Sequence, residues 1–219
     1  GLRLSAKLLG GAYNPLKLYY NETYRQEVIE EGITHFEALS WHDLVDRLIL
    51  GDEAPATLFG WNTLAAVTPY NETFHNETGL WLRPYYDLLA EEYVFHNWLI
   101  NRTMSAMNAI VEAFQTVYPD LMVGWSTMPW SGYEPALLKG DFLGGGYYTQ
   151  DVRKFYSMIR HAILSRNDST PVYSVIMGND DPTDPLGLSL EQQEQFFWTA
   201  YFAGGAGIYW FDMGNNAHW

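Results

Sequence analysis

The 219-residue sequence contains no cysteine and few basic residues. Without cysteine it has neither a disulfide scaffold nor a thiolate metal site. Lys and Arg total 12 against 26 Asp and Glu, which gives a formal net charge of -14. Because such a negative field repels phosphate backbones, we expect no nucleic-acid partner.

Long apolar runs and cofactor-binding loops are missing as well. No stretch approaches the roughly 18 apolar residues needed to cross a bilayer, so we expect no membrane-spanning segment. The six histidines show no ligand spacing, and we expect no metal and no cofactor. The glycines at 144–146 lie inside a strand-like run rather than at the start of a helix, unlike a dinucleotide-binding loop. No nucleophile-elbow pattern supports Ser-His-Asp hydrolysis.

The sequence is rich in apolar and aromatic residues. Hydrophobic residues make up 47% and charged residues 17%, which is typical of a folded chain with a proper core. Nine Trp and sixteen Tyr are unusually many. Flat aromatic surfaces suit the C–H faces of sugar rings, so this surplus favours a carbohydrate partner.

Sequons for N-glycosylation occur in excess of what this composition gives by chance. The acceptor positions are Asn21, Asn71, Asn76, Asn101 and Asn167. Glycans on Asn-x-Ser/Thr are added to surface positions of proteins that enter the secretory route. We therefore expect a secreted or cell-surface glycoprotein.

Strand-like and helix-like segments alternate along the chain. We predict strands near 2–9, 44–50, 121–125, 142–148, 171–177 and 206–211. We predict helices over 21–31, ending near Gly32, and over 84–118, 152–165 and 189–203, the last opened by a capping box at Ser189 and Gln192 and ended by Gly204. Such spacing is too long for hairpins and indicates one α/β domain with a parallel sheet over residues 1–219. Residues near 54–83 show no clear period, so we expect an irregular excursion there.

The predicted strand at 44–50 ends in Gly51 and two adjacent acids, Asp52 and Glu53. Neighbouring carboxylates repel, so one of them can stay protonated near neutral pH and serve as a proton donor. The alternative is a solvated acidic turn after a buried strand.

Three segments carry a resemblance to a known family: 48–55 (Leu-Ile-Leu-Gly-Asp-Glu-Ala-Pro), 95–121 and 197–211. The first is similar to the "Asn-Glu-Pro" signature of the (β/α)8-barrel glycoside hydrolases that place the acid/base after barrel strand four. The second and third resemble the following long helix and the last helix and strand of beta-galactosidase-like members. The resemblance implies a TIM-barrel fold in which the six strands are barrel strands three to eight, apparently incomplete at the N-terminus. A further protein segment or subunit would then complete the barrel.

This resemblance assigns roles to residues at the strand ends. Glu53 matches the acid/base, and Asp52 stands where the family usually has a sugar-binding Asn. The family's nucleophile is a Glu ending strand seven, but 171–179 contains no Glu, so Asp180 or Asp181 would have to replace it. The further candidate substrate-binding residues are Trp125, Trp130, Tyr147, Asn179, Trp210 and Asp212. The aromatic residues among them could equally be packing residues.

Three functional hypotheses follow. The first is an extracellular glycoside hydrolase-like protein that acts on or binds a carbohydrate through the C-terminal mouth of the barrel. The second is a catalytically degenerate, N-glycosylated cell-surface or structural protein. The third is an unrelated α/β binding module, which an open sheet rather than a barrel would favour. The acid pair after 44–50 favours the first hypothesis, and the missing Glu and the sequons favour the second.

Overall fold

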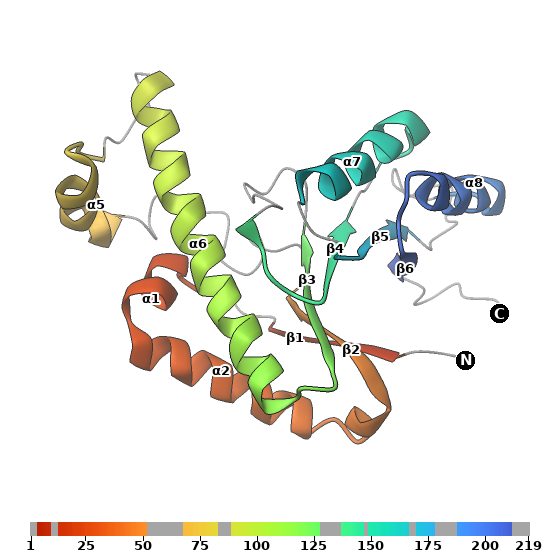
Figure 1. The fold of residues 1–219 in the computed structure, drawn as a ribbon, viewed down its shortest axis with the longest axis horizontal. Helices are drawn as coiled ribbons and strands as arrows, with labels where there is room; N and C mark the ends of the chain where they lie inside the picture. Colours follow the sequence, from red (N-terminus) through yellow and green to blue (C-terminus); the bar gives the residue numbers. More distant parts are fainter. Residues whose placement is uncertain are drawn as a thin grey trace.

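The computed structural model describes residues 4–9, 13–51, 68–82, 89–127, 137–146, 149–166, 170–177 and 188–211. The strands are β1 (Leu4–Leu9), β2 (Val45–Gly51), β3 (Met122–Thr127), β4 (Phe142–Gly146), β5 (Val172–Met177) and β6 (Gly207–Phe211). The helices are α1 (Pro15–Tyr20), α2 (Glu22–Glu37), α5 (Asn71–Thr78), α6 (Leu89–Val117), α7 (Val152–Ser165) and α8 (Leu190–Phe202), with short 3-10 turns at His42–Leu44 and Thr68–Tyr70. Along this part of the chain helices stand between successive strands, except between β3 and β4, where the described residues contain no helix (Figure 1).

The six strands form one sheet in the order β1-β2-β3-β4-β5-β6, and every neighbouring pair is parallel. Strand order therefore equals chain order, with a crossover between each strand and the next. This is the repeating pattern of a (β/α)8 barrel. The fold is a partial TIM barrel, and the α/β class predicted from the sequence is confirmed.

The sheet is curled rather than flat. Arg47 of β2 places its guanidinium carbon 4.6 Å from the ring centroid of Tyr173 on β5. Two strands stand between β2 and β5 in the sheet, so on a flat sheet the two backbones would lie roughly 14 Å apart. The two side chains meet because the sheet bends around them. We call the side that carries them the concave face.

Glycines make room for large aromatic rings on this concave face. A Cβ on Gly207 would lie 2.9 Å from ring atoms of Tyr173, and a Cβ on Gly124 would lie 3.0 Å from the ring of Phe142. The rings of Phe142 and Tyr173 meet edge to face, with centroids 5.8 Å apart. The interior is therefore filled by side chains, as in other small parallel barrels.

The opposite face of the sheet packs against the helices and forms the main core. Leu48 and Leu50 of β2 are fully buried there, together with Val123 and Trp125 of β3. The helices contribute apolar side chains at three- and four-residue spacing, as an amphipathic helix does. These are Val28, Ile29 and Phe36 of α2, Met107, Ile110 and Phe114 of α6, Phe155 and Ile159 of α7, and Phe196 and Ala200 of α8.

The helices begin and end at residues that are typical helix caps. Asn14 caps α1 by accepting hydrogen bonds from the backbone N–H groups of Leu16 and Lys17, and proline occupies the first turn. Ser189 and Gln192 form the predicted capping box of α8. Gly204 follows α8 with φ +90°, a left-handed conformation that favours glycine, so the predicted C-terminal cap is confirmed.

Three helices differ from the sequence-based expectation, and one of them, α1, was not predicted at all. The α2 helix continues through Gly32 to Glu37, because Phe36 beyond the glycine is buried against the core and against Tyr118. That burial outweighs the roughly 1 kcal/mol that glycine costs in a helix. Part of the excursion near 54–83, expected to be irregular, forms α5. The Phe74 side chain of α5 packs with Phe95 and Trp98 of α6 in a second, smaller core.

Candidate active-site end of the barrel

The C-terminal ends of all six strands lie along one edge of the sheet. This follows from their parallel direction, and the last residues are Leu9, Gly51, Thr127, Gly146, Met177 and Phe211. In (β/α)8-barrel enzymes the segments that leave this edge carry the catalytic and binding groups. The candidate site residues predicted from the sequence follow the strands at this edge in the chain.

β2 ends at this edge, and the acid pair follows it directly in the sequence. It lies between β1 and β3, and its last residue, Gly51, is buried and paired in register with Leu9 of β1. Asp52 and Glu53 follow Gly51 directly in the sequence but lie outside the described residues. The same is true of Trp130, Tyr147, Asn179, Asp180, Asp181 and Asp212, each of which follows a strand end. Their roles stay predictions.

Trp125 and Trp210 are the two candidates that lie on described strands. Trp125 is fully buried, and it belongs to the cluster formed with the helices. It faces away from the concave side, so the packing role left open by the sequence describes its position here. The alternation of Val123 and Trp125 on β3 is the signal that could have shown this, because residues two apart share a face. Trp210 lies on β6 and pairs in register with Ile176 of β5.

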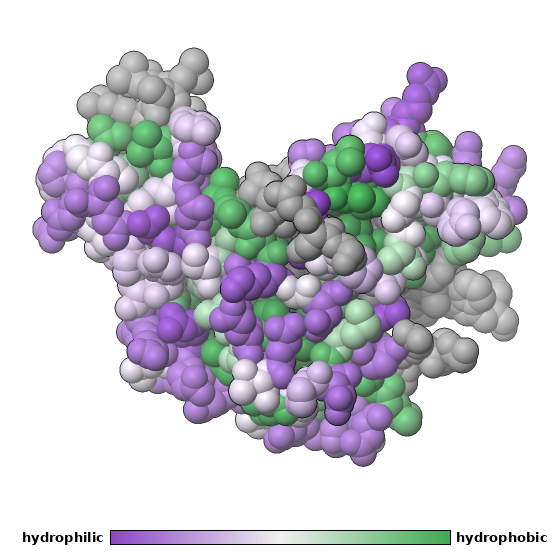
Figure 2. Space-filling model, in the orientation of Figure 1, coloured by the Kyte–Doolittle hydropathy of each residue, from purple (hydrophilic) through white to green (hydrophobic). Residues whose placement is uncertain are grey.

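The long helix α6 rises past this edge of the sheet. Its 29 residues span roughly 43 Å, whereas the six residues of β3, which follows it, span roughly 20 Å. A short turn joins the end of α6 to β3, so the excess length projects at the other end, beyond the C-terminal edge of the strands (Figure 1). α5 packs against this projecting half, and the two form a lobe with a largely hydrophilic surface (Figure 2).

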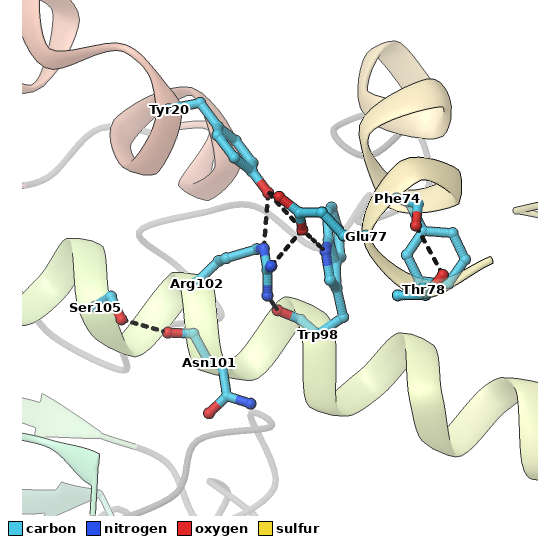
Figure 3. A network of polar contacts seen from close by, with 8 residues as sticks. All are labelled: Tyr20, Phe74, Glu77, Thr78, Trp98, Asn101, Arg102 and Ser105. Carbon is cyan, nitrogen blue, oxygen red and sulfur yellow. Dashed lines mark hydrogen bonds and ion pairs between the residues drawn. The ribbon is translucent and has the colours of Figure 1, made fainter. Parts of the chain in front are cut away.

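A network of polar contacts fixes the lobe to the barrel (Figure 3). The Glu77 carboxylate of α5 accepts hydrogen bonds from the Tyr20 hydroxyl at 2.9 Å and from Trp98 Nε1 at 2.6 Å. Arg102 of α6 forms an ion pair with the same carboxylate, and its Nε donates to the Tyr20 hydroxyl at 2.7 Å. Residues from α1, α5 and α6 thus converge on one carboxylate.

The electrostatics of this network follow from its donors. Burial alone raises the pKa of Glu77, but hydrogen bonds from Trp98 and Tyr20 and the charge of Arg102 outweigh it, so the pKa lies below its ordinary value. Burial, only partly opposed by the hydrogen bond from Arg102, raises the pKa of Tyr20 to about 12. Glu77 is therefore an ionised anchor for its three donors, and the arrangement positions the lobe rather than moving protons.

The sequons lie on several outer surfaces. Asn21, Asn76 and Asn101 are exposed, and Asn101 sits on the outer side of α6, as expected from the helical period. Asn71 is half-buried, and its Oδ1 accepts a hydrogen bond from the backbone N–H of Leu82. Asn167 lies outside the described residues.

Within the described ranges, no group of three or more His, Asp or Glu side chains is arranged to hold a metal ion. In the same part of the chain, no helix has the length and apolarity needed to cross a membrane.

Comparisons with known proteins bear on the fold. No family and no curated protein sequence matches this chain. Among solved structures it is similar to an agarase, AgWH50C, with 11% identity and a TM-score of 0.62 over 96% of this chain and 37% of that one. It is also similar to a family 1 β-glucosidase from Thermotoga maritima, with 13% identity and a TM-score of 0.55 over 92% and 61% of the two chains. The fold is glycoside hydrolase-like.

A third similar structure is a β-glucuronidase from Bacteroides uniformis, with 12% identity and a TM-score of 0.50 over 89% of this chain and 22% of that one. Identities this low bear on the fold alone. The chain spans less than two thirds of the length of each of these three structures.

Two groups of residues were not predicted from the sequence, the polar network of the lobe and Arg47, which lies nearer the N-terminal end of β2. The contacts among Tyr20, Glu77 and Arg102 join residues that are 25 to 82 positions apart in the sequence. No local sequence pattern predicts such pairs. Arg47 was overlooked because it lies inside an apolar strand, although a charged residue there is itself a sign of a special environment.

Proposed function

We propose that this chain acts on or binds a carbohydrate at the C-terminal end of its barrel strands, as part of an extracellular glycoside hydrolase-like protein. The observation that carries the proposal is the end of β2. An interior strand of a curled parallel sheet finishes on a buried glycine, and the sequence continues at once with Asp52 and Glu53. The similarity of the fold to glycoside hydrolases supports the same reading.

In this proposal Glu53 protonates the glycosidic oxygen as general acid. Asp52 accepts a hydrogen bond from a sugar hydroxyl. Asp180 or Asp181, after β5, supplies the second carboxylate, with Asn179 beside it. A retaining enzyme needs the two carboxyl groups about 5–5.5 Å apart, and an inverting enzyme needs about 6.5–9.5 Å.

Aromatic residues after other strands complete the proposed binding surface. Trp130, Tyr147 and Trp210 would stack on sugar rings, and Asp212 would bind hydroxyl groups. Trp125 has no part in it, because its side chain is buried among the helices.

A second candidate function is carbohydrate binding or assembly without turnover. The observation in its favour is that β5, the counterpart of barrel strand seven, runs from Val172 to Met177 without a Glu, and none follows in Gly178 or Asn179. A barrel that kept its sugar-binding surface but lost its nucleophile would be a binding or structural glycoprotein at the cell surface. The exposed sequons at Asn21, Asn76 and Asn101 are compatible with either candidate.

The test compares Glu53→Gln with the parent chain on a panel of soluble polysaccharides, by reducing-end release and by binding isotherms. We expect Glu53→Gln to reduce turnover at least about 100-fold while binding is retained. Glu27→Gln, at an exposed position of α2, is the matched control and should leave both unchanged. Binding by the parent chain without any product release would support the second candidate. Absence of both binding and release across the panel would overturn the proposal.

A further inference from the structure

Trp81 presents its indole ring to solvent on the lobe formed by α5 and α6. Its side chain is 53% exposed. The residues on either side of it, Leu80 and Leu82, both pack against the second core with Phe74. When two residues flanking a third turn inward, the third is turned outward, as along a strand. The packing of its neighbours therefore directs Trp81 away from the core.

One face of the indole is covered by the imidazole of His75 on α5. The two rings are stacked, with centroids 3.9 Å apart and planes inclined by 12°. Within the described part of the chain, His75 Nδ1 is buried and has no hydrogen-bond partner. The imidazole is thus a flat support for the indole. An aromatic residue with a purely packing role would bury both faces of its ring, whereas more than half of Trp81 stays exposed.

The short segment that carries Trp81 is fixed on both sides by hydrogen bonds. The backbone N–H of Leu80 donates to Thr78 Oγ1 at 3.2 Å, and the backbone N–H of Leu82 donates to Asn71 Oδ1 at 2.9 Å. A ring that is already held in place loses little conformational entropy when a ligand binds, and this favours affinity. Trp81 is therefore preorganised as a flat binding surface.

The lobe holds this ring apart from the strand ends. α5 packs against Trp98 of α6, on the side of α6 away from the strands (Figure 1). From Trp98 to its end at Val117, α6 rises roughly 28 Å, whereas β3 spans roughly 20 Å. The ring thus belongs to the same end of the molecule as the proposed carbohydrate site, but only a long ligand could contact both.

The surroundings of Trp81 favour a sugar over an apolar partner. The lobe has a largely hydrophilic surface (Figure 2), and Glu72 and Asn76 of α5 are exposed. The centre of a protein interface is a contiguous apolar patch, whereas a sugar ring needs one flat aromatic face with hydrogen-bonding groups around it. The net charge of -14 repels polyanions, so the expected sugar chain is uncharged.

We propose that Trp81, backed by His75, is a second carbohydrate-binding site, where an uncharged polysaccharide stacks one of its sugar rings on the open face of the indole. The inference rests on the proposed function for the class of ligand and adds a point of attachment outside the barrel end. Two attachment points on one polymer strengthen the binding of long chains over short ones, because the second contact forms at a high effective concentration.

The test measures binding isotherms of the full polypeptide, native and enzymatically deglycosylated, with a soluble β-glucan, a galactan and a galactomannan. Alginate is the anionic comparison. We expect Trp81→Ala to weaken binding of the preferred neutral polymer about three- to tenfold, and Trp81→Phe, which keeps a flat ring, to weaken it less than about twofold. His75→Ala should weaken binding about two- to threefold because the indole loses its support, and His75→Phe should restore it.

Trp41→Ala is the matched control. Trp41 is also exposed, at 38%, but it precedes β2 at the N-terminal end of the strands, so its loss should leave binding unchanged. Each variant should keep the Tm of the parent within about 2 °C, which separates a lost contact from a damaged fold.

Unchanged binding by Trp81→Ala, with binding and turnover by the parent intact, would overturn the inference and leave the proposed function standing. Weaker binding by Trp81→Ala, together with turnover that Glu53→Gln does not change, would support the site at Trp81 and overturn the role of Glu53. No binding of any of the three neutral polymers would overturn both.

Three further outcomes would assign the ring to another occupant and overturn the proposal. Alginate bound as tightly as the neutral polymers would contradict an uncharged ligand. Binding that appears only after deglycosylation would mean that the protein's own glycan covers Trp81. A parent dimer in sedimentation that Trp81→Ala dissociates, with polysaccharide binding unchanged, would assign the ring to a second copy of the chain.

Discussion

Arg47 on β2 lies over the ring of Tyr173 on β5, with 4.6 Å between the guanidinium carbon and the ring centroid, although β3 and β4 separate the two strands. The contact exists only while four strands keep their curvature. It therefore reports on the curl of the whole sheet more directly than any contact between neighbouring strands.

We predict a measurable coupling between these two residues. In a double-mutant cycle with Arg47→Met and Tyr173→Leu, the coupling energy should be about 0.5–2 kcal/mol, since a partly buried cation over an aromatic ring is stabilising. Urea denaturation of the four proteins measures it. Tyr156→Leu, at an exposed position of α7, replaces Tyr173→Leu in the control cycle and should be additive with Arg47→Met. Zero coupling for the test pair would mean that the sheet is flatter in solution.

Gly207→Ala should destabilise the protein, because the new Cβ would lie 2.9 Å from Cδ1 and Cε1 of Tyr173. We expect a loss of about 1–3 kcal/mol in the free energy of unfolding. The loss should shrink when Tyr173→Leu is present, since the opposing ring is then gone. Gly144→Ala is the control: a Cβ there meets its nearest atoms at 3.4 Å, an ordinary contact. Equal losses for the two glycines would contradict the packing described for the concave face.

Much of this fold was predictable because its signals are local. Five of the six strands begin within a residue of the predicted position and β1 within two, and helix α7 matches its predicted range of 152–165. Apolar runs and helical periods are set by neighbours in the sequence. α1 and α5 were missed because they are short. Each depends on packing against α6, which no window of sequence contains.

The anchor at Glu77 gives the next prediction. Glu77→Gln should lower the free energy of unfolding at pH 7 by about 1–2 kcal/mol, because Trp98, Tyr20 and Arg102 lose a charged acceptor. Glu112→Gln is the control. The pair of Glu112 with Lys139 is more than half exposed on both sides, so its loss should cost under about 0.5 kcal/mol.

Glu77 should also make the free energy of unfolding depend on pH in the acidic range. The pKa of Glu77 is lower in the folded protein than its ordinary value of 4.5. Its contribution to stability is therefore present above that value and is lost as the pH falls through the folded pKa. The difference in unfolding free energy between the parent and Glu77→Gln should be constant from pH 7 to about 5 and shrink below about 4.5. A constant difference down to pH 3 would exclude this linkage.

Tyr118 should make the free energy of unfolding decrease at alkaline pH. Burial and the nearby Glu37 carboxylate, to which its hydroxyl donates a hydrogen bond, raise the pKa of Tyr118 to about 12. A pKa raised above the ordinary value of 10.0 stabilises the fold fully below pH 10, and this is lost as the pH rises toward 12. Tyr118→Phe should be less stable than the parent at pH 8, with the gap closing between pH 10 and 12. The control Tyr156→Phe, at an exposed position, should show no such trend in urea denaturation.

The candidate site was less predictable than the fold. Trp125 was ranked with residues that could stack on sugars because it ends the predicted strand, but its side chain lies with that of Val123 on the face toward the helices. The sequence shows that these two residues share a face, whereas which face the helices cover depends on the assembled sheet. The contacts of Glu77 with Tyr20, Trp98 and Arg102 depend on how α5 meets α6 in space. Position along a strand can be read from sequence, whereas partners brought together by crossovers cannot.

The last prediction concerns the sequons. Asn76 and Asn101 are exposed on helices, whereas the Asn71 side chain is half-buried and bonded through Oδ1 to the backbone N–H of Leu82. A glycan on Asn71 would crowd the segment that packs beside α5, so we expect Asn76 and Asn101 to be more fully occupied than Asn71. Peptide mass spectrometry of the native protein, before and after enzymatic deglycosylation, measures each site. Asn76→Gln and Asn101→Gln should each remove one glycan mass without changing the Tm. An entirely unmodified native protein would contradict the proposal that it is secreted or displayed at the cell surface.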